Sequence, residues 1–353
     1  MKGIVMSRVR FFAALSAALI AFSAVSCSHQ IHVDDTQQDV TSTATGEGEK
    51  ETTSENTEKE TDDINSYIKV KKAKPAMWKV TDTETGNELY ILGIMRFATQ
   101  YTFDLPDYVD KAYKESSGVV VEYDVSGVAP DPEQLTEFYS YIIYNDGTTV
   151  RDHISEETYE TAKDYLRKYS YYNESMDGYS ANGWASQVNG AALERVENLV
   201  MENIDSKYLA KAKEDGKEVL GLEGLETQIE TMAAYTDELS DFMIYDTVRR
   251  AKDIRAFTAN LAYQYDCWAR GDVDALDEEY YWNDRSPDLD DDYAAYLDVS
   301  LYKRNGNMAD KISGFLKDGK KYFVVIGVTH FSGTRGIDDL LTEKGYKVEL
   351  INK

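Results

Sequence analysis

The apolar positions between residues 77 and 123 fall into short runs separated by turn residues, a pattern typical of strands. Residues 77–82 and 88–93 predict two strands, and Glu84–Asn87 between them predicts a hairpin turn. A helix is expected over 105–117, followed by a valine-rich strand at 118–123. The folded part of the chain therefore begins with the order strand, strand, helix, strand.

The middle of the chain has apolar residues three and four positions apart, which is helical spacing. This spacing predicts a long, tyrosine-rich helical region over 132–206, a strand at 218–223, and more helix over 227–270. The acidic run Asp288–Asp292 lacks the glycine-punctuated spacing of a calcium loop, so we expect a solvated loop there.

Alternating elements return at the C-terminal end of the chain. We expect a helix at 308–316, a strand at 322–327, a helix at 337–344 and a strand at 347–351. Such alternation favours an α/β domain over 68–353, with a mixed β-sheet core flanked by helices. A large helical insertion would separate its N-terminal and C-terminal strand-containing parts.

The first residues carry export signals. A basic start and an apolar run over 11–25, too short to span a bilayer, predict a signal peptide over 1–26. The tetrapeptide Ala24-Val25-Ser26-Cys27 resembles the lipobox of bacterial lipoproteins, in which the cysteine becomes the acylated, palmitate-bearing first residue. We therefore expect an extracellular protein, lipid-anchored through Cys27 to the outer face of the bacterial cell membrane. Ordinary cleavage and release is the alternative.

Residues 27–67 are rich in Thr, Ser, Glu and Asp and contain almost no large apolar residue. They predict a lipidated, disordered acidic linker, because such a segment buries too little surface to offset its conformational entropy. The formal net charge of −26 argues against nucleic acid as a partner. With Cys27 acylated, Cys267 has no disulfide partner and is expected to be a small buried residue. We assign His153, just before the expected helix N-cap Ser155, a surface or capping role.

Four polar side chains lie at or just after the carboxyl ends of predicted strands. They are Arg96, Glu122, Glu223 and His330. Because ligand-binding and catalytic groups gather at the carboxyl ends of strands in open α/β sheets, we expect these residues to converge on one site.

The sequence also resembles the TraB/GumN family, whose relatives include the Tiki metalloproteases. The resemblance covers 74–353 and rests on the following pieces: Trp78 with Gly93-Ile94-Met95, Leu105-Pro106, Val119–Glu122, Asp205, Gly216–Glu223 with Gln228, Gly271-Asp272, Arg304-Asn305 with Met308, Phe323–His330, and Gly345–Val348. It implies an α/β fold with two Gly-x-x-His motifs and a glutamate around a divalent metal. The second motif is present as Gly327–His330, whereas the histidine position of the first is Arg96.

Arg96 changes what the resemblance implies, because an arginine is a permanent cation with no lone pair for a metal. Three interpretations follow. His330 and the carboxylates Glu122 and Glu223 could still hold a metal weakly. Arg96 could instead pair with Glu122 or Glu223 and take the place of the metal, or it could clamp an anionic group of a substrate.

Two functions follow from these interpretations. In the first, the protein is a metal-dependent hydrolase, a peptidase, with Glu122, Glu223 and His330 as catalytic residues. Its Mn, Co or Zn ion would be held by His330 and Glu122, and Arg96, Arg304 and Asn305 would bind substrate. In the second, which we favour, the metal site is impaired and no metal is required. The chain would then act at the envelope as a module that binds a peptide or protein partner or transmits a signal.

Overall fold

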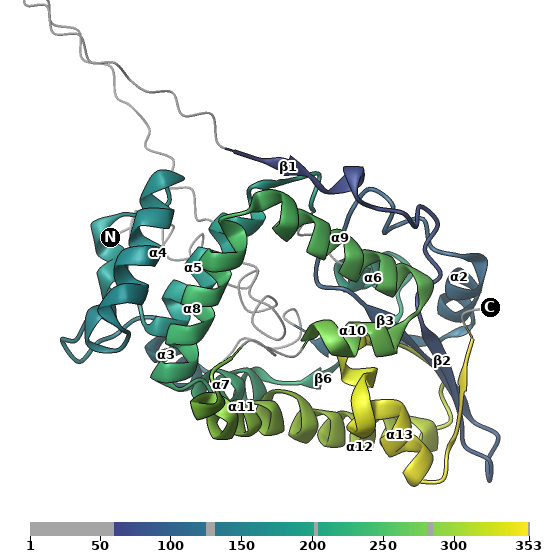
Figure 1. Ribbon diagram of the computed structural model, residues 1–353. Coiled ribbons are helices and arrows are strands. Elements are labelled where there is room, and N and C mark those ends of the chain that lie inside the picture. Colours follow the sequence, from purple (N-terminus) through teal and green to yellow (C-terminus); the bar gives the residue numbers. More distant parts are fainter. Residues whose placement is uncertain (1–59, 125–130, 201–203, 281–284, 352–353) are drawn as a thin grey trace, which may run out of the picture.

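The computed structural model describes residues 60–124, 131–200, 204–280 and 285–351 (Figure 1). The predicted signal peptide and the predicted lipidation site, Cys27, lie outside these ranges. The centre is a six-stranded sheet in the order β6-β4-β7-β3-β2-β8. Its strands are β2 (Met77–Thr81), β3 (Glu88–Ile94), β4 (Gly118–Tyr123), β6 (Glu218–Glu223), β7 (Tyr322–Gly327) and β8 (Lys347–Leu350).

The sheet is mixed, and its parallel part carries the polar residues of interest. Strands β6, β4, β7 and β3 run parallel to one another, while β2 is antiparallel to both β3 and β8. All residues of β7 are buried, as expected for a central parallel strand covered on both faces. The carboxyl ends of four parallel strands therefore meet at one edge of the sheet.

Helices account for most of the other described residues. They are α2 (Asp107–Glu115), α3 (Pro132–Ser140), α4 (Glu156–Lys168), α5 (Ala181–Leu193), α6 (Ile204–Glu214), α7 (Leu225–Ala233), α8 (Asp237–Ala251), α9 (Ile254–Arg270), α10 (Val273–Tyr280), α11 (Asp290–Leu297), α12 (Arg304–Lys317) and α13 (Ile337–Glu343). Short 3₁₀ segments are η1 (Ile64–Ser66), η2 (Val150–Asp152), η3 (Glu174–Gly178), η4 (Pro287–Leu289), η6 (Val328–Phe331) and η7 (Gly333–Arg335), and η5 (Asp298–Lys303) is a π-helical turn.

Each face of the sheet has its own apolar core. Residues of α2, α6 and α9 pack on one face, and residues of α12 and α13 pack on the other. A third core lies among α4, α5 and α8, which stand beside the sheet in Figure 1. The expected fold class, an α/β domain with a large helical insertion, is confirmed.

The folded structure includes residues before 68. Strand β1 (Asp62–Asp63) pairs in parallel with β5 (Val196–Glu197), and the side chain of Ile64 is fully buried. Neither short strand was predicted, because a two-residue strand has no hydrophobic periodicity of its own.

The region 132–206, expected to be helical, is divided into α3, α4, α5 and the start of α6, with η2, η3 and the short strand β5 between them. Ser155 and Ser180 begin α4 and α5 by accepting backbone hydrogen bonds as N-caps. Ser170 adopts a left-handed φ of 64° after α4, and Asn198 a φ of 61° after β5. Apolar spacing continues from α4 to α5 because both helices pack on the same core.

The acidic run near residue 290 is also not a loop. Asp290, Asp291 and Asp292 form the first turn of α11, where the positive end of the helix dipole favours carboxylates. Cys267 is buried, as expected. Within the described ranges, none of the helices is long and apolar enough to cross a bilayer.

Candidate functional site

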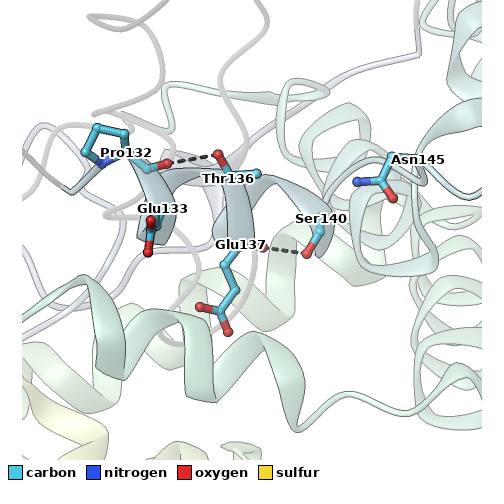
Figure 2. A pocket seen from close by; sticks show the side chains of 6 residues that line it. All are labelled: Pro132, Glu133, Thr136, Glu137, Ser140 and Asn145. Carbon is cyan, nitrogen blue, oxygen red and sulfur yellow. Dashed lines mark hydrogen bonds between the residues drawn. The ribbon is translucent and has the colours of Figure 1, made fainter.

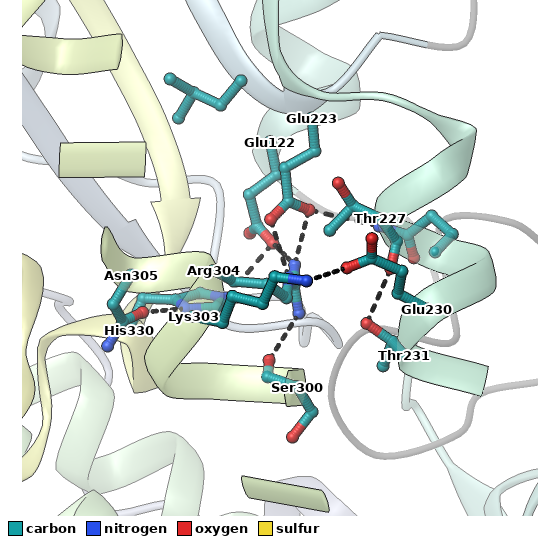
Figure 3. A network of polar contacts seen from close by, with 12 residues as sticks. Glu122, Glu223, Thr227, Glu230, Thr231, Ser300, Lys303, Arg304, Asn305 and His330 are labelled. Carbon is teal, nitrogen blue, oxygen red and sulfur yellow. Dashed lines mark hydrogen bonds and ion pairs between the residues drawn. The ribbon is translucent and has the colours of Figure 1, made fainter. Parts of the chain in front are cut away.

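The four strand-following residues come together, and Arg304 joins them. Glu122 is the penultimate residue of β4 and Glu223 the last residue of β6, and both are buried. Arg96 follows β3, and His330 lies in η6 directly after β7. Figure 3 shows the Arg304 guanidinium facing both glutamates, with Ser300 on its other side. The convergence follows from the parallel sheet, which brings these strand ends to one edge.

Arg96 forms an ion pair with Glu122. Its Nη2 contacts Oε2 of Glu122, and its Nη1 lies 3.9 Å from Oδ2 of Asp205 at the start of α6. Of the two glutamates considered for this pairing, Glu122 is therefore the partner. Burial raises the pKa of Asp205, an effect that Arg96 partly opposes. Asp205 belongs to the matched family pieces, but its sequence context gave it no role.

Arg304 is the central cation of the site. It follows the π-helical turn η5, and its Nη1 donates to the carbonyl of Ser300 at 3.0 Å. Its Nε and Nη2 donate to Glu223, and Nη2 also donates to Oε1 of Glu122 at 2.9 Å. Single π-helical turns are often found at functional sites. Sequence reasoning had assigned Arg304 to substrate rather than to both glutamates.

Glu122 is saturated with donors. Its Oε2 accepts from Arg96 and from the backbone N–H of Gly327, and its Oε1 accepts from Arg304. Burial alone would raise the pKa of Glu122, but the neighbouring cations Arg96 and Arg304 hold it well below its usual range. Gly327 allows this approach, because an added Cβ there would lie 3.2 Å from Oε2 of Glu122.

His330 is oriented by Asn305. The Asn305 Nδ2 donates to the carbonyl of Arg335 at 2.8 Å, so its Oδ1 faces His330 Nδ1 at 2.6 Å. The Nδ1 of His330 therefore carries the proton, while Nε2 lies 3.4 Å from Oε1 of Glu122. Burial lowers the pKa of His330, which keeps the ring neutral near pH 7.

As arranged, these residues do not fit a divalent metal. Within the described part of the chain, no group of three or more His, Cys, Asp or Glu side chains is placed to hold one. Glu122, one of the two expected ligands, gives its oxygens to arginines and a backbone N–H. A guanidinium cation beside the same carboxylate would also repel a second cation.

The remaining polar features have structural roles. Gln228 on α7 donates to Glu223 at 3.3 Å, and Lys303 pairs with Glu230 beside the site in Figure 3. His153 bonds Thr148 and Asp237, in agreement with its surface assignment.

A shallow hollow runs along α3 (Figure 2). It is lined by Pro132, Glu133, Thr136, Glu137, Ser140 and Asn145.

The fold and the site define an α/β protein whose polar centre lies at the carboxyl ends of its parallel strands. The chain belongs to the TraB/PrgY/gumN family, whose model matches residues 76–350. It is 21% identical over 329 residues to "Metalloprotease TIKI2" of Danio rerio and 22% identical over 337 residues to "Metalloprotease TIKI2" of Xenopus tropicalis. These alignments cover 81% and 82% of this chain but 61% of each relative. No solved structure matches the chain significantly.

Proposed function

We propose that this protein is a divergent family member in which an arginine has replaced the metal, and that it acts as a binding or signalling module. The observation that supports this proposal is the pairing of Arg96 with Glu122. Arg304 and Gly327 fill the other acceptor positions of Glu122, so a metal ligand role for Glu122 requires Arg96 to leave. The charged groups at this site are therefore paired with one another in a network of ion pairs.

We further propose that the module is exported and anchored through Cys27 to the outer face of the bacterial cell membrane. The basic and apolar N-terminus and the lipobox-like Ala24–Cys27 support this location. Its partner would be a peptide or protein outside the cell. Loss of membrane association in a Cys27→Ser variant, tested by detergent-phase partitioning, would support the anchor, and unchanged partitioning would contradict it.

The deciding experiment measures divalent metal binding. Titration calorimetry with Mn²⁺, Co²⁺ and Zn²⁺ would be performed on the wild type, on Arg96→His, and on Arg151→His as a control for an added histidine. We expect stoichiometric binding in Arg96→His alone, because that change removes the cation beside Glu122 and supplies a ligand. Tight, stoichiometric binding by the wild type would overturn the proposal.

A second candidate function is a metal-dependent peptidase. Two observations favour it: the matched relatives are named metalloproteases, and His330 has a geometry typical of metal-binding histidines. Its Nδ1–H is held by an amide oxygen while Nε2 faces a carboxylate. Metal-stimulated peptide cleavage by the wild type, lost in His330→Ala, would establish this function. Equal activity with and without His330 would reject it.

A further inference from the structure

The first described residues of the chain dock on the segment that follows α5. We call residues 60–70 the strap. Arg195, whose side chain is fully buried, donates from Nε to the carbonyl of Glu60 at 3.0 Å. The N–H of Asp62 donates to the carbonyl of Arg195 at 3.1 Å, and Asn198 donates to the carboxylate of Asp63 at 2.9 Å. The strap is therefore held through its backbone as an added strand.

Two further contacts fix the strap against the main core. Ile64 is fully buried in the same apolar cluster as Val196. The buried carboxylate of Asp266 on α9 accepts the backbone N–H groups of Lys69 and Val70, with the shorter contacts at 3.1 and 2.9 Å. Figure 1 shows β1 beside α9. A carboxylate that binds two successive N–H groups defines one position of the strap rather than a loose association.

The segment on which the strap docks leads directly to Arg96. Val200 and Ala98 exchange both backbone hydrogen bonds, at 2.7 and 2.8 Å, and Ala98 lies two residues after Arg96. Asp205, near the start of α6, faces the same Arg96 guanidinium. Residues 195–200 therefore contact the strap at one end and pair with the loop that carries Arg96 at the other.

We propose that the strap is a latch for the candidate site. Docked, it fixes residues 195–200 and so keeps Arg96 against Glu122. Released, it allows that segment and the Arg96 loop to move away together, which opens Glu122 to a divalent cation or to a cationic group of a partner. This inference rests on the proposed function, since it assumes that Arg96 closes the site. A partner that binds the strap would act on the site by shifting the balance between these two states.

The test uses the full chain with substitutions in the strap. Asp62→Pro removes the N–H that bonds Arg195, and Ile64→Ser removes the buried anchor. Ser66→Ala alters an exposed strap side chain and serves as the control. Faster tryptic cleavage at Lys69 to Lys72 verifies release. Amide hydrogen exchange at Ala98 and Val200 and Mn²⁺ calorimetry then report on the loop and on the site.

We expect both release variants to exchange the Ala98 and Val200 amides at least tenfold faster than the control. They should also bind Mn²⁺ at least tenfold more tightly than wild type. In an Arg96→His background the same strap substitutions should change Mn²⁺ affinity less than about twofold, because the latch acts through Arg96. Unchanged exchange, or faster exchange without tighter Mn²⁺ binding, in a chain whose strap is cleaved would overturn the latch.

Two release variants are used so that loss of folding can be distinguished from failure of the latch. If Ile64→Ser no longer unfolds cooperatively, the latch is judged from Asp62→Pro alone. That variant keeps the buried Ile64 side chain in place. If the wild type itself binds Mn²⁺ tightly, the proposed function fails. In that case slow exchange of Ala98 and Val200 in the release variants would overturn the latch as well, and fast exchange would uphold the link between strap and loop.

Discussion

Arg304 binds Glu223 through two parallel hydrogen bonds, Nε to Oε1 at 2.7 Å and Nη2 to Oε2 at 2.8 Å. The same Nη2 also donates to Glu122, so one planar cation connects the ends of β4 and β6. This geometry requires the forked donors of a guanidinium, since the ammonium group of a lysine is a single point of charge.

Arg304→Lys should therefore destabilise the protein although the charge is kept. We expect the free energy of unfolding to fall by about 2–4 kcal/mol, because a lysine cannot satisfy both buried glutamates. Urea denaturation measures the loss. Arg151→Lys, which alters an exposed pair with Glu156, is the matched control and should leave the urea midpoint nearly unchanged. Equal effects of the two changes would contradict the central role of Arg304.

Glu122→Gln should destabilise the protein more than the small difference between the two side chains suggests. The change removes a buried negative charge from between Arg96 and Arg304, at an expected cost of about 3–5 kcal/mol. Adding Arg96→Met should recover part of that loss, because one stranded cation disappears with it. A double-mutant cycle by chemical denaturation should give a coupling above about 1 kcal/mol. Additive effects would show that Arg96 and Glu122 act independently.

Asp338→Asn should stabilise the protein in a pH-dependent manner. Burial raises the pKa of Asp338 to about 6, so the folded state holds this proton more tightly than the unfolded chain. Ionised Asp338 therefore lowers stability above pH about 6, and the cost disappears as the pH falls towards 4. Thermal unfolding should show Asp338→Asn more stable than wild type by about 1–3 kcal/mol at pH 7.5, a difference that shrinks to nearly zero only at about pH 3.5, below the unfolded pKa. An equal difference at both pH values would argue against a raised pKa.

The proton on His330 should depend on Asn305. In the wild type, ¹⁵N NMR of the imidazole should show the Nδ1–H form, because Asn305 Oδ1 accepts from that nitrogen. Asn305→Ala removes the acceptor and should produce a mixture of both neutral forms, whereas Asn305→Asp keeps an acceptor and should retain Nδ1–H. A single unchanged form in Asn305→Ala would mean that other contacts set the proton.

The sequence predicted the strands of the main sheet and the convergence of four polar residues, since buried valine-rich runs followed by charge are local signals. The pairing of Arg96 with Glu122 was one of the interpretations that the sequence left open. The contact of Arg304 with both glutamates could not be predicted, because it depends on how a π-helical turn places α12 against two strand ends. The strap was missed for a related reason: Ile64 is a single apolar residue in an acidic stretch, and its burial depends on a core formed by distant segments.

The position of β7 has a consequence for the order of folding. This strand lies between β3 and β4, although it comes about 200 residues after them in the chain. Strands β3 and β4 each use one side to bind it, so neither can complete its hydrogen bonds until the C-terminal part of the chain is available. A nascent chain that lacks this strand has two unfilled strand edges where the mature protein has the middle of its sheet.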